Sequence, residues 1–223
     1  MRLVKVLNIK KIMKVKTGLR IAGSDEEIRI GGIDNPIIRD PLTGYPYIPG
    51  SSLKGSLRSI LEISSGKTEP CSCGRCSICK IFGKANKKET EELREHTRII
   101  HTRIIVRDAF LTENSKRILN ELLPFGVEIK KENTIDRIKG TAKPRTFDRI
   151  PKGVEFEVNI VLKIFEGDNE DELLDVLNLA FKLVEFNYIG GSGSRGYGQV
   201  EFTDAGITVF DVAEEINKVM GSK

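Results

Sequence analysis

The sequence of 223 residues has no long apolar run. A membrane-spanning helix needs about 18 or more consecutive apolar residues, and the chain contains no such stretch. The N-terminal segment 1–7 carries Arg2 and Lys5 and lacks the apolar centre of a secretory signal peptide. We therefore expect a cytoplasmic protein that has no membrane partner.

Aromatic residues and histidines are also scarce. The chain has no tryptophan, only 6% aromatic residues and two histidines. Few aromatic rings make base stacking a minor way of binding a nucleic acid, so contacts with the phosphate backbone are favoured. Two histidines supply little material for histidine acid–base catalysis or for a Ser-His-Asp triad.

The cysteines lie within one short segment. They are Cys71, Cys73, Cys76 and Cys79. Disulfides among such near neighbours would close almost no loop, whereas closely spaced thiolates suit a tetrahedral metal site, with zinc as the first choice. An iron–sulfur cluster is a competitor, because this spacing matches the first part of a ferredoxin run. His96 or His101 could replace one thiolate, and free surface thiols are the alternative to any metal.

The net charge of +4 conceals a polarised chain. Residues 1–20 hold seven basic side chains and no acid, and residues 137–152 hold six basic side chains and one acid. Residues 166–185, in contrast, hold seven acids and one lysine. Clustered bases are typical of proteins that bind polyanions, although a solvated surface would have the same composition.

The hydrophobic pattern predicts one α+β domain over residues 1–223. Strands are expected at 1–20, 98–111, 154–165 and 199–203, and helices at 51–62, 170–186 and 209–219. Residues 64–98 are interpreted as a surface insertion, and residues 128–152 as an irregular, basic one. The order of strands and helices predicts a ferredoxin-like (RRM-like) core, with an antiparallel sheet and two helices.

A glycine-rich loop occupies residues 190–198. Residues 191–196 match the letters of a dinucleotide-binding fingerprint, but that fingerprint follows a strand and opens a helix, whereas this loop follows a helix and enters a strand. The loop is either a flexible connection or a backbone that phosphate can approach closely, with Arg195 beside it.

The helix expected at 51–62 carries two further candidates. Lys54 and Arg58 are four residues apart and therefore share one helix face, which is either a solvated surface or a phosphate contact. The pair Arg107-Asp108 is interpreted as an ion pair at a strand end.

Several motifs together carry a family resemblance. They are Ile48-Pro-Gly-Ser-Ser-Leu-Lys-Gly-Ser-Leu-Arg58, the cysteine segment with Ile81-Phe82-Gly83, Arg107-Asp108-Ala109, Glu132-Asn133-x-Ile135-Asp136-Arg137 and the glycine loop. The chain resembles the backbone RAMP subunit of type III-A (Csm) CRISPR effector complexes from about residue 3 to residue 203.

The resemblance implies an RNA-guided function. Residues 64–98 would form a zinc-containing lid, and residues 128–152 a thumb-like hairpin that interrupts the guide–target duplex. The expected partners are a CRISPR guide RNA, a target RNA, copies of the chain in a helical filament and other subunits of the complex. The subunit would cut target RNA at regular intervals with a divalent cation such as Mg²⁺. A non-catalytic RNA-binding scaffold is the main alternative. A stand-alone repeat-processing nuclease is disfavoured by the scarcity of histidine.

The resemblance also assigns roles to residues. The catalytic residue would be Asp34, which matches the family's catalytic aspartate in its Gly-Gly-Ile-Asp loop. A carboxylate with a divalent ion can activate a sugar 2′-hydroxyl for attack on the adjacent phosphate. Asp25 and Asp40 are local rivals, and an Asx turn before Asn35 is the structural alternative for Asp34. The expected RNA-binding residues are Ser51, Ser52, Lys54, Arg58, Arg137, Arg145, Gly191, Gly193, Ser194 and Arg195.

Overall fold

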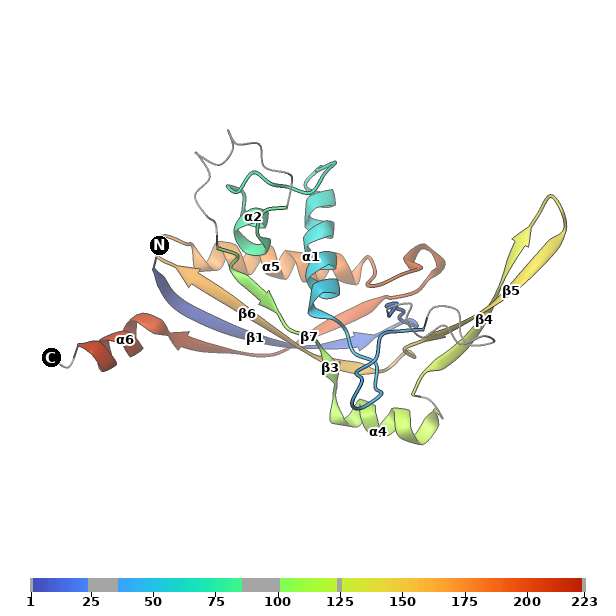
Figure 1. Cartoon of the computed structure of the whole chain (residues 1–223). Coiled ribbons are helices and arrows are strands. Elements are labelled where there is room, and N and C mark those ends of the chain that lie inside the picture. Colours follow the sequence, from blue (N-terminus) through green and yellow to red (C-terminus); the bar gives the residue numbers. More distant parts are fainter. Residues whose placement is uncertain (1, 24–35, 86–100, 124–125, 222–223) are drawn as a thin grey trace.

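The computed structural model describes residues 2–23, 36–85, 101–123 and 126–221. An antiparallel sheet forms the body of the molecule (Figure 1). Its strands are β1 (Leu3–Val15), β2 (Ile104–Val106), β3 (Phe110–Leu111), β6 (Glu155–Phe165) and β7 (Val200–Asp211). The spatial order is β2-β6-β1-β7, and β3 also pairs with β6. Since β6 separates β1 from β2, the sheet has the split βαβ arrangement that the sequence predicts.

Two amphipathic helices cover one face of this sheet (Figure 1). They are α1 (Gly50–Ser64) and α5 (Glu170–Glu185). Their buried apolar residues recur every three or four positions, which places them on one side of each helix. The Asn169 side chain caps α5 by accepting the backbone N–H of Glu172 at 3.2 Å. The observed ends of both helices agree with the predicted ends to within two residues.

A second, two-stranded sheet extends away from the body (Figure 1). Strand β4 (Glu128–Asp136) pairs with β5 (Thr141–Arg149), and their register runs without a break. The turn is closed by the Asp136 carboxylate, which accepts the backbone N–H groups of Ile138 and Lys139, each at 3.0 Å. The expectation of irregular structure in this segment was wrong, because its many exposed basic side chains obscured the strand pattern.

The C-terminal strand is longer than predicted. Strand β7 continues to Asp211, and helix α6 (Val212–Met220) begins three residues later than expected. The sequence Asp204-Ala205-Gly206 has the composition of a turn, but the structure accommodates it as a β-bulge opposite Lys10 and Lys11. Gly206 adopts a φ of +120°, which a side chain would disfavour.

The strand predicted at 98–111 is two short strands, β2 and β3, within the described residues.

Two helices were not predicted at all. Helix α2 (Ser77–Phe82) buries Ile78, Ile81 and Phe82 in the core, so residues 77–82 are not a surface insertion. Helix α4 (Glu113–Leu122) begins where the Thr112 hydroxyl accepts the backbone N–H of Ser115. In the described part of the chain, no helix is long and apolar enough to span a membrane.

Candidate RNA interface and metal centre

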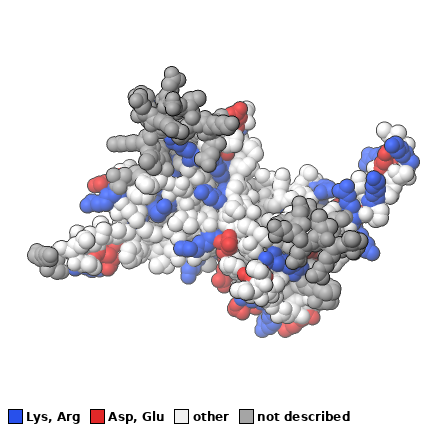
Figure 2. Space-filling model, viewed as in Figure 1, with Lys and Arg blue, Asp and Glu red and all other residues white. Residues whose placement is uncertain are grey.

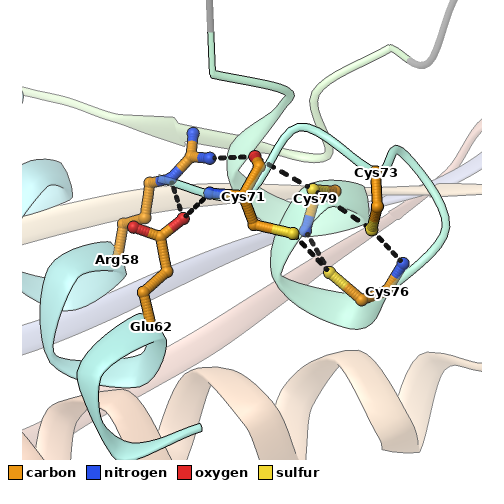
Figure 3. Close-up of polar contacts among 6 residues, drawn as sticks. All are labelled: Arg58, Glu62, Cys71, Cys73, Cys76 and Cys79. Atoms are coloured by element: carbon orange, nitrogen blue, oxygen red, sulfur yellow. Dashed lines mark hydrogen bonds and ion pairs between the residues drawn. The ribbon is translucent and has the colours of Figure 1, made fainter. Parts of the chain in front are cut away.

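The cysteine segment folds into a compact group of thiols (Figure 3). The four sulfur atoms lie within 4.8 Å of one another. The Sγ atoms of Cys71 and Cys76 are 3.8 Å apart, and those of Cys73 and Cys79 are 3.9 Å apart. A tetrahedral ion with metal–sulfur bonds of about 2.3 Å requires sulfur–sulfur separations of about 3.8 Å. The four thiols are therefore spaced as ligands of one metal ion.

Backbone groups and burial tune these thiols in opposite directions. Backbone N–H groups of Arg75 and Cys76 donate to the Cys73 sulfur at 3.4 and 3.5 Å, and they lower its pKa to about 6. Burial raises the pKa of Cys79 to about 12 and also raises that of Cys76. Thiols with a raised pKa are mostly protonated at neutral pH. A bound cation would stabilise their thiolate form.

Among the described residues, His101 is not part of this group. The His101 ring stacks on Phe165 at 6.0 Å between centroids. His96 lies outside the described residues.

Helix α1 holds the cysteine segment through an ion pair (Figure 3). Arg58 donates to the Glu62 carboxylate at 2.9 Å and to the backbone carbonyl of Cys71 at 2.8 Å. The same Glu62 oxygen accepts the backbone N–H of Cys71 at 2.8 Å. The Arg58 and Glu62 side chains are only 17% and 10% exposed. Arg58, expected at the RNA surface, is therefore engaged in fixing the first cysteine to the helix.

The start of α1 remains accessible. Ser51 is exposed, and Ser52 and Lys54 are half-buried. Partial burial lowers the pKa of Lys54, and the nearby charges of Arg58 and Lys163 lower it further. Crowded, partly dehydrated cations of this kind gain from an added anion.

Asp108 caps this helix, a role that sequence reasoning missed. Its carboxylate accepts the backbone N–H of Gly50 at 2.7 Å. A Cβ at Gly50 would lie 2.3 Å from the carbonyl oxygen of Val106, so only glycine permits this close approach. The cap was missed because Asp108 lies 58 residues from the helix it stabilises. The sequence predicted an ion pair with Arg107 instead.

The β4–β5 hairpin presents the most exposed basic surface. Figure 2 shows Lys and Arg along this arm, at the end of the molecule opposite α6. Its exposed cations are Lys131, Arg137, Lys139, Lys143 and Arg145. These side chains can reach a polyanion without first losing a buried partner.

The glycine loop lies between α5 and β7 and contains a single 3₁₀ turn, η2 (Gly193–Arg195). A Cβ at Gly190 would lie 2.2 Å from the carbonyl oxygen of Arg20, so the start of the loop packs closely against residue 20. Ser194 and Gly191 are exposed, and the Arg195 side chain is 61% exposed.

The loop is also joined to the hairpin. Arg195 hydrogen-bonds the Ser192 hydroxyl at 2.6 Å and lies 3.8 Å from the Glu132 carboxylate of β4. The glycine loop is beside the base of the hairpin, whereas the start of α1 is near β2 and α5. The predicted RNA-binding residues of these two regions therefore form two groups.

Asp34 and Asp25 lie outside the described residues. The chain that flanks them is held at the base of the hairpin. Gly23 N–H donates to the Pro36 carbonyl at 2.9 Å. Asp148 of β5, which is buried, accepts the backbone N–H of Ile37 at 3.0 Å. The rival Asp40 is engaged in a turn, where the backbone N–H of Thr43 lowers its pKa.

Comparison with known proteins agrees with this layout. Residues 12–201 match the RAMP superfamily. The chain is 42% identical over 196 residues to the CRISPR system Cms endoribonuclease Csm3 of Methanothermobacter thermautotrophicus, covering 84% of this chain and 79% of that protein. It is 40% identical over 198 residues to the protein of the same name from Streptococcus thermophilus, covering 85% and 84%. The chain belongs to the Csm3 family of RAMP proteins.

Members of the Csm3 family also share the fold. One similar chain is in a crystal structure of the Csm3-Csm4 subcomplex of the type III-A CRISPR-Cas interference complex. The matched chain is 30% identical, with a TM-score of 0.63 over 99% of this chain and 88% of that one. The predicted family and fold class are therefore confirmed.

Proposed function

We propose that this chain is the guide-RNA-binding backbone subunit of a type III-A CRISPR complex and cuts complementary target RNA. The observation that carries the proposal is the near full-length similarity to proteins named Csm endoribonucleases. The exposed hairpin cations and the glycine loop support it, because both offer groups that bind phosphate. The Csm3-Csm4 subcomplex supports assembly with other Csm subunits, and copies of this chain would stack along the guide as a filament.

The proposed RNA-contacting residues lie in two regions, a guide-binding surface and the β4–β5 hairpin. Ser51, Ser52 and Lys54 at the start of α1 would contact guide phosphates, and the exposed Ser194 and Arg195 of the glycine loop would do the same. Arg58 supports this surface from beneath, since its guanidinium is occupied by Glu62 and Cys71. The hairpin would act as the thumb that interrupts the duplex, with Arg137 and Arg145 on target or guide phosphates.

Asp34 is the proposed catalytic residue. A divalent ion such as Mg²⁺ beside a carboxylate would stabilise the charge that develops when the sugar 2′-oxygen attacks the adjacent phosphorus. The 2′-hydroxyl passes its proton to a water molecule as it attacks, the bond from phosphorus to the 5′-oxygen breaks, and that oxygen takes up a proton from water. The products are a 2′,3′-cyclic phosphate end and a 5′-hydroxyl end. The position of the flanking residues beside Asp148 supports a reaction near the hairpin base.

The cysteines would hold a structural zinc ion. Four thiolates leave no open position for substrate, which is the pattern of structural rather than catalytic zinc. In a four-iron iron–sulfur cluster each thiolate binds a different iron, so the sulfurs would be spread further apart than the 4.8 Å seen here.

The experiment that tests this function is co-expression with the partner subunits of the complex. Sequencing of the co-purified RNA should yield short guides that share a repeat-derived end, and the complex should cut a complementary RNA at regular spacing in Mg²⁺. Random cellular RNA would contradict guide binding. Guide-loaded complex that binds target without cutting it would establish the scaffold alternative.

A further inference from the structure

Tyr197 lies between two cations of the hairpin base. Its side chain is buried, although it follows directly on the exposed part of the glycine loop. The Lys130 ammonium of β4 lies 4.5 Å from the ring centroid, and the Arg149 guanidinium of β5 lies 5.0 Å from it. The Tyr197 hydroxyl donates a hydrogen bond to the Glu132 carboxylate of β4. One residue of the loop thus contacts both strands of the hairpin.

The two cations are held in place by carboxylates. Arg149 donates two hydrogen bonds to Glu128, at 2.9 and 2.6 Å. Lys130 lies 3.0 Å from Glu132, whose hydrogen bond raises the pKa of the lysine. The charges of these two cations and two carboxylates balance, and the exposed Arg195 lies at the edge of the cluster, 3.8 Å from Glu132. The cluster is therefore not a phosphate site like the exposed hairpin cations. Its arrangement suits a joint, in which each charged group already has a partner.

The loop side of the joint is equally constrained. Gly196 and Gly198 flank Tyr197 with φ of +83° and +75°, a backbone that other residues rarely adopt. A Cβ at Gly198 would lie 2.1 Å from the carbonyl oxygen of Ile189. The Gly198 N–H donates to the Gly18 carbonyl at 3.1 Å. The direction of the Tyr197 ring is therefore set by backbone packing.

We propose that Tyr197 is a positioning residue that fixes the angle of the β4–β5 hairpin relative to the glycine loop. The inference rests on the proposed function. If the loop holds the guide and the hairpin interrupts the duplex, the angle between them determines where the target strand is presented for cutting. Loss of the ring would leave guide binding intact and let the hairpin move. A displacement of about 1 Å can slow a positioned reaction about a hundredfold.

The test uses the complex assembled with guide RNA and three variants of this chain. Tyr197→Leu removes the ring, and Tyr197→Phe removes only the hydroxyl. The matched control is Tyr45→Phe, since the Tyr45 hydroxyl bonds Asn120 outside the hairpin and the loop. We expect Tyr197→Leu to cut about tenfold or more slowly at saturating target, at scattered positions, with unchanged KM and guide occupancy. Tyr197→Phe should keep the cutting positions and lose about twofold in rate, and the control should match wild type.

Lys130→Ala provides a second route if Tyr197→Leu does not assemble. It removes one cation from the ring and should broaden the cutting positions in the same way, to a smaller extent. Wild-type cutting positions and rate in both Tyr197→Leu and Lys130→Ala would contradict the role of Tyr197 in fixing the angle of the hairpin. Loss of guide binding in Tyr197→Leu alone would also overturn it, by assigning Tyr197 to RNA binding. A wild-type complex that does not cut would refute the proposed function instead.

Discussion

The cysteine segment packs on the ferredoxin-like body, whereas the β4–β5 hairpin projects from it. Their polar groups are used in opposite ways. In the cysteine segment, the four sulfurs lie together, and Arg58 and Glu62 of α1 bind each other and the Cys71 backbone. In the hairpin, Arg137 and Arg145 are exposed. The polar groups of the first region stabilise the fold, whereas the exposed arginines of the second are accessible to a partner. Substitutions should therefore affect stability in one region and binding in the other.

The largest expected effect is loss of the metal ligands. Cys79→Ser should abolish binding of one zinc ion and lower the free energy of unfolding by about 4–5 kcal/mol, since removal of a structural metal is among the most damaging changes. Elemental analysis and urea unfolding would measure the two quantities. Ser72→Ala, in the same loop, should change neither. A wild-type protein that binds no zinc after reconstitution would contradict the metal assignment.

Arg58→Ala should have the next largest effect. It leaves the Glu62 carboxylate buried without its cation and removes the hydrogen bond to the Cys71 carbonyl. We expect a loss of about 2–3 kcal/mol in the free energy of unfolding. The matched change Lys54→Ala, one turn earlier on the same helix, should cost under about 1 kcal/mol but weaken RNA binding. Equal stability of the two variants would remove the structural role given to Arg58.

The hairpin should respond in the reverse sense. Arg137→Ala combined with Arg145→Ala should change the free energy of unfolding by less than about 0.5 kcal/mol, because both side chains are exposed. RNA affinity, measured across a salt series, should fall about tenfold, and the slope of log affinity against log salt should decrease by about 1.4. Lys218→Ala on α6 serves as the control and should leave the slope unchanged. An unchanged slope in the hairpin variant would show that these arginines do not contact phosphate.

The smallest effect concerns pH at the hairpin base. The hydrogen bond from Tyr197 and the Lys130 ammonium lower the pKa of Glu132 below its usual value of 4.5. A lowered folded-state pKa contributes stability above the unfolded pKa, and this contribution is lost as the pH falls through the folded pKa. Glu132→Gln should therefore cost under about 1 kcal/mol at neutral pH and nothing in acid. Thermal unfolding at neutral and acidic pH would measure this, and a pH-independent difference would contradict it.

The sequence predicted the body of the fold better than its edges. Helix α1 was predicted well because Leu53, Leu57 and Leu61 repeat at helical spacing on a face that is buried. The edge elements β2 and β3 are short and their pattern is weak, and the second half of β7 is exposed on both faces. Such segments are defined by pairing with distant strands, which no local pattern records.

The same limit applies to the candidate site. Closely spaced cysteines predicted a metal site because their ligands come from one segment. The cap on α1 by Asp108 and the contacts of Tyr197 with Lys130 and Arg149 were not predicted, since each joins residues far apart in the chain. Arg58 has the right residue type and spacing for a phosphate contact, but in the structure it forms an ion pair with Glu62, four residues later.

The most direct test of the account is target cleavage by the guide-loaded complex that contains Asp34→Ala. Periodic cutting should be lost, by about a hundredfold or more, while guide occupancy and target affinity stay at wild-type values. Asp40→Ala should still cut, because Asp40 is engaged in a turn. The wild-type fragments should carry 2′,3′-cyclic phosphate and 5′-hydroxyl ends. Regular cutting by Asp34→Ala at the wild-type rate would contradict the proposed catalytic role.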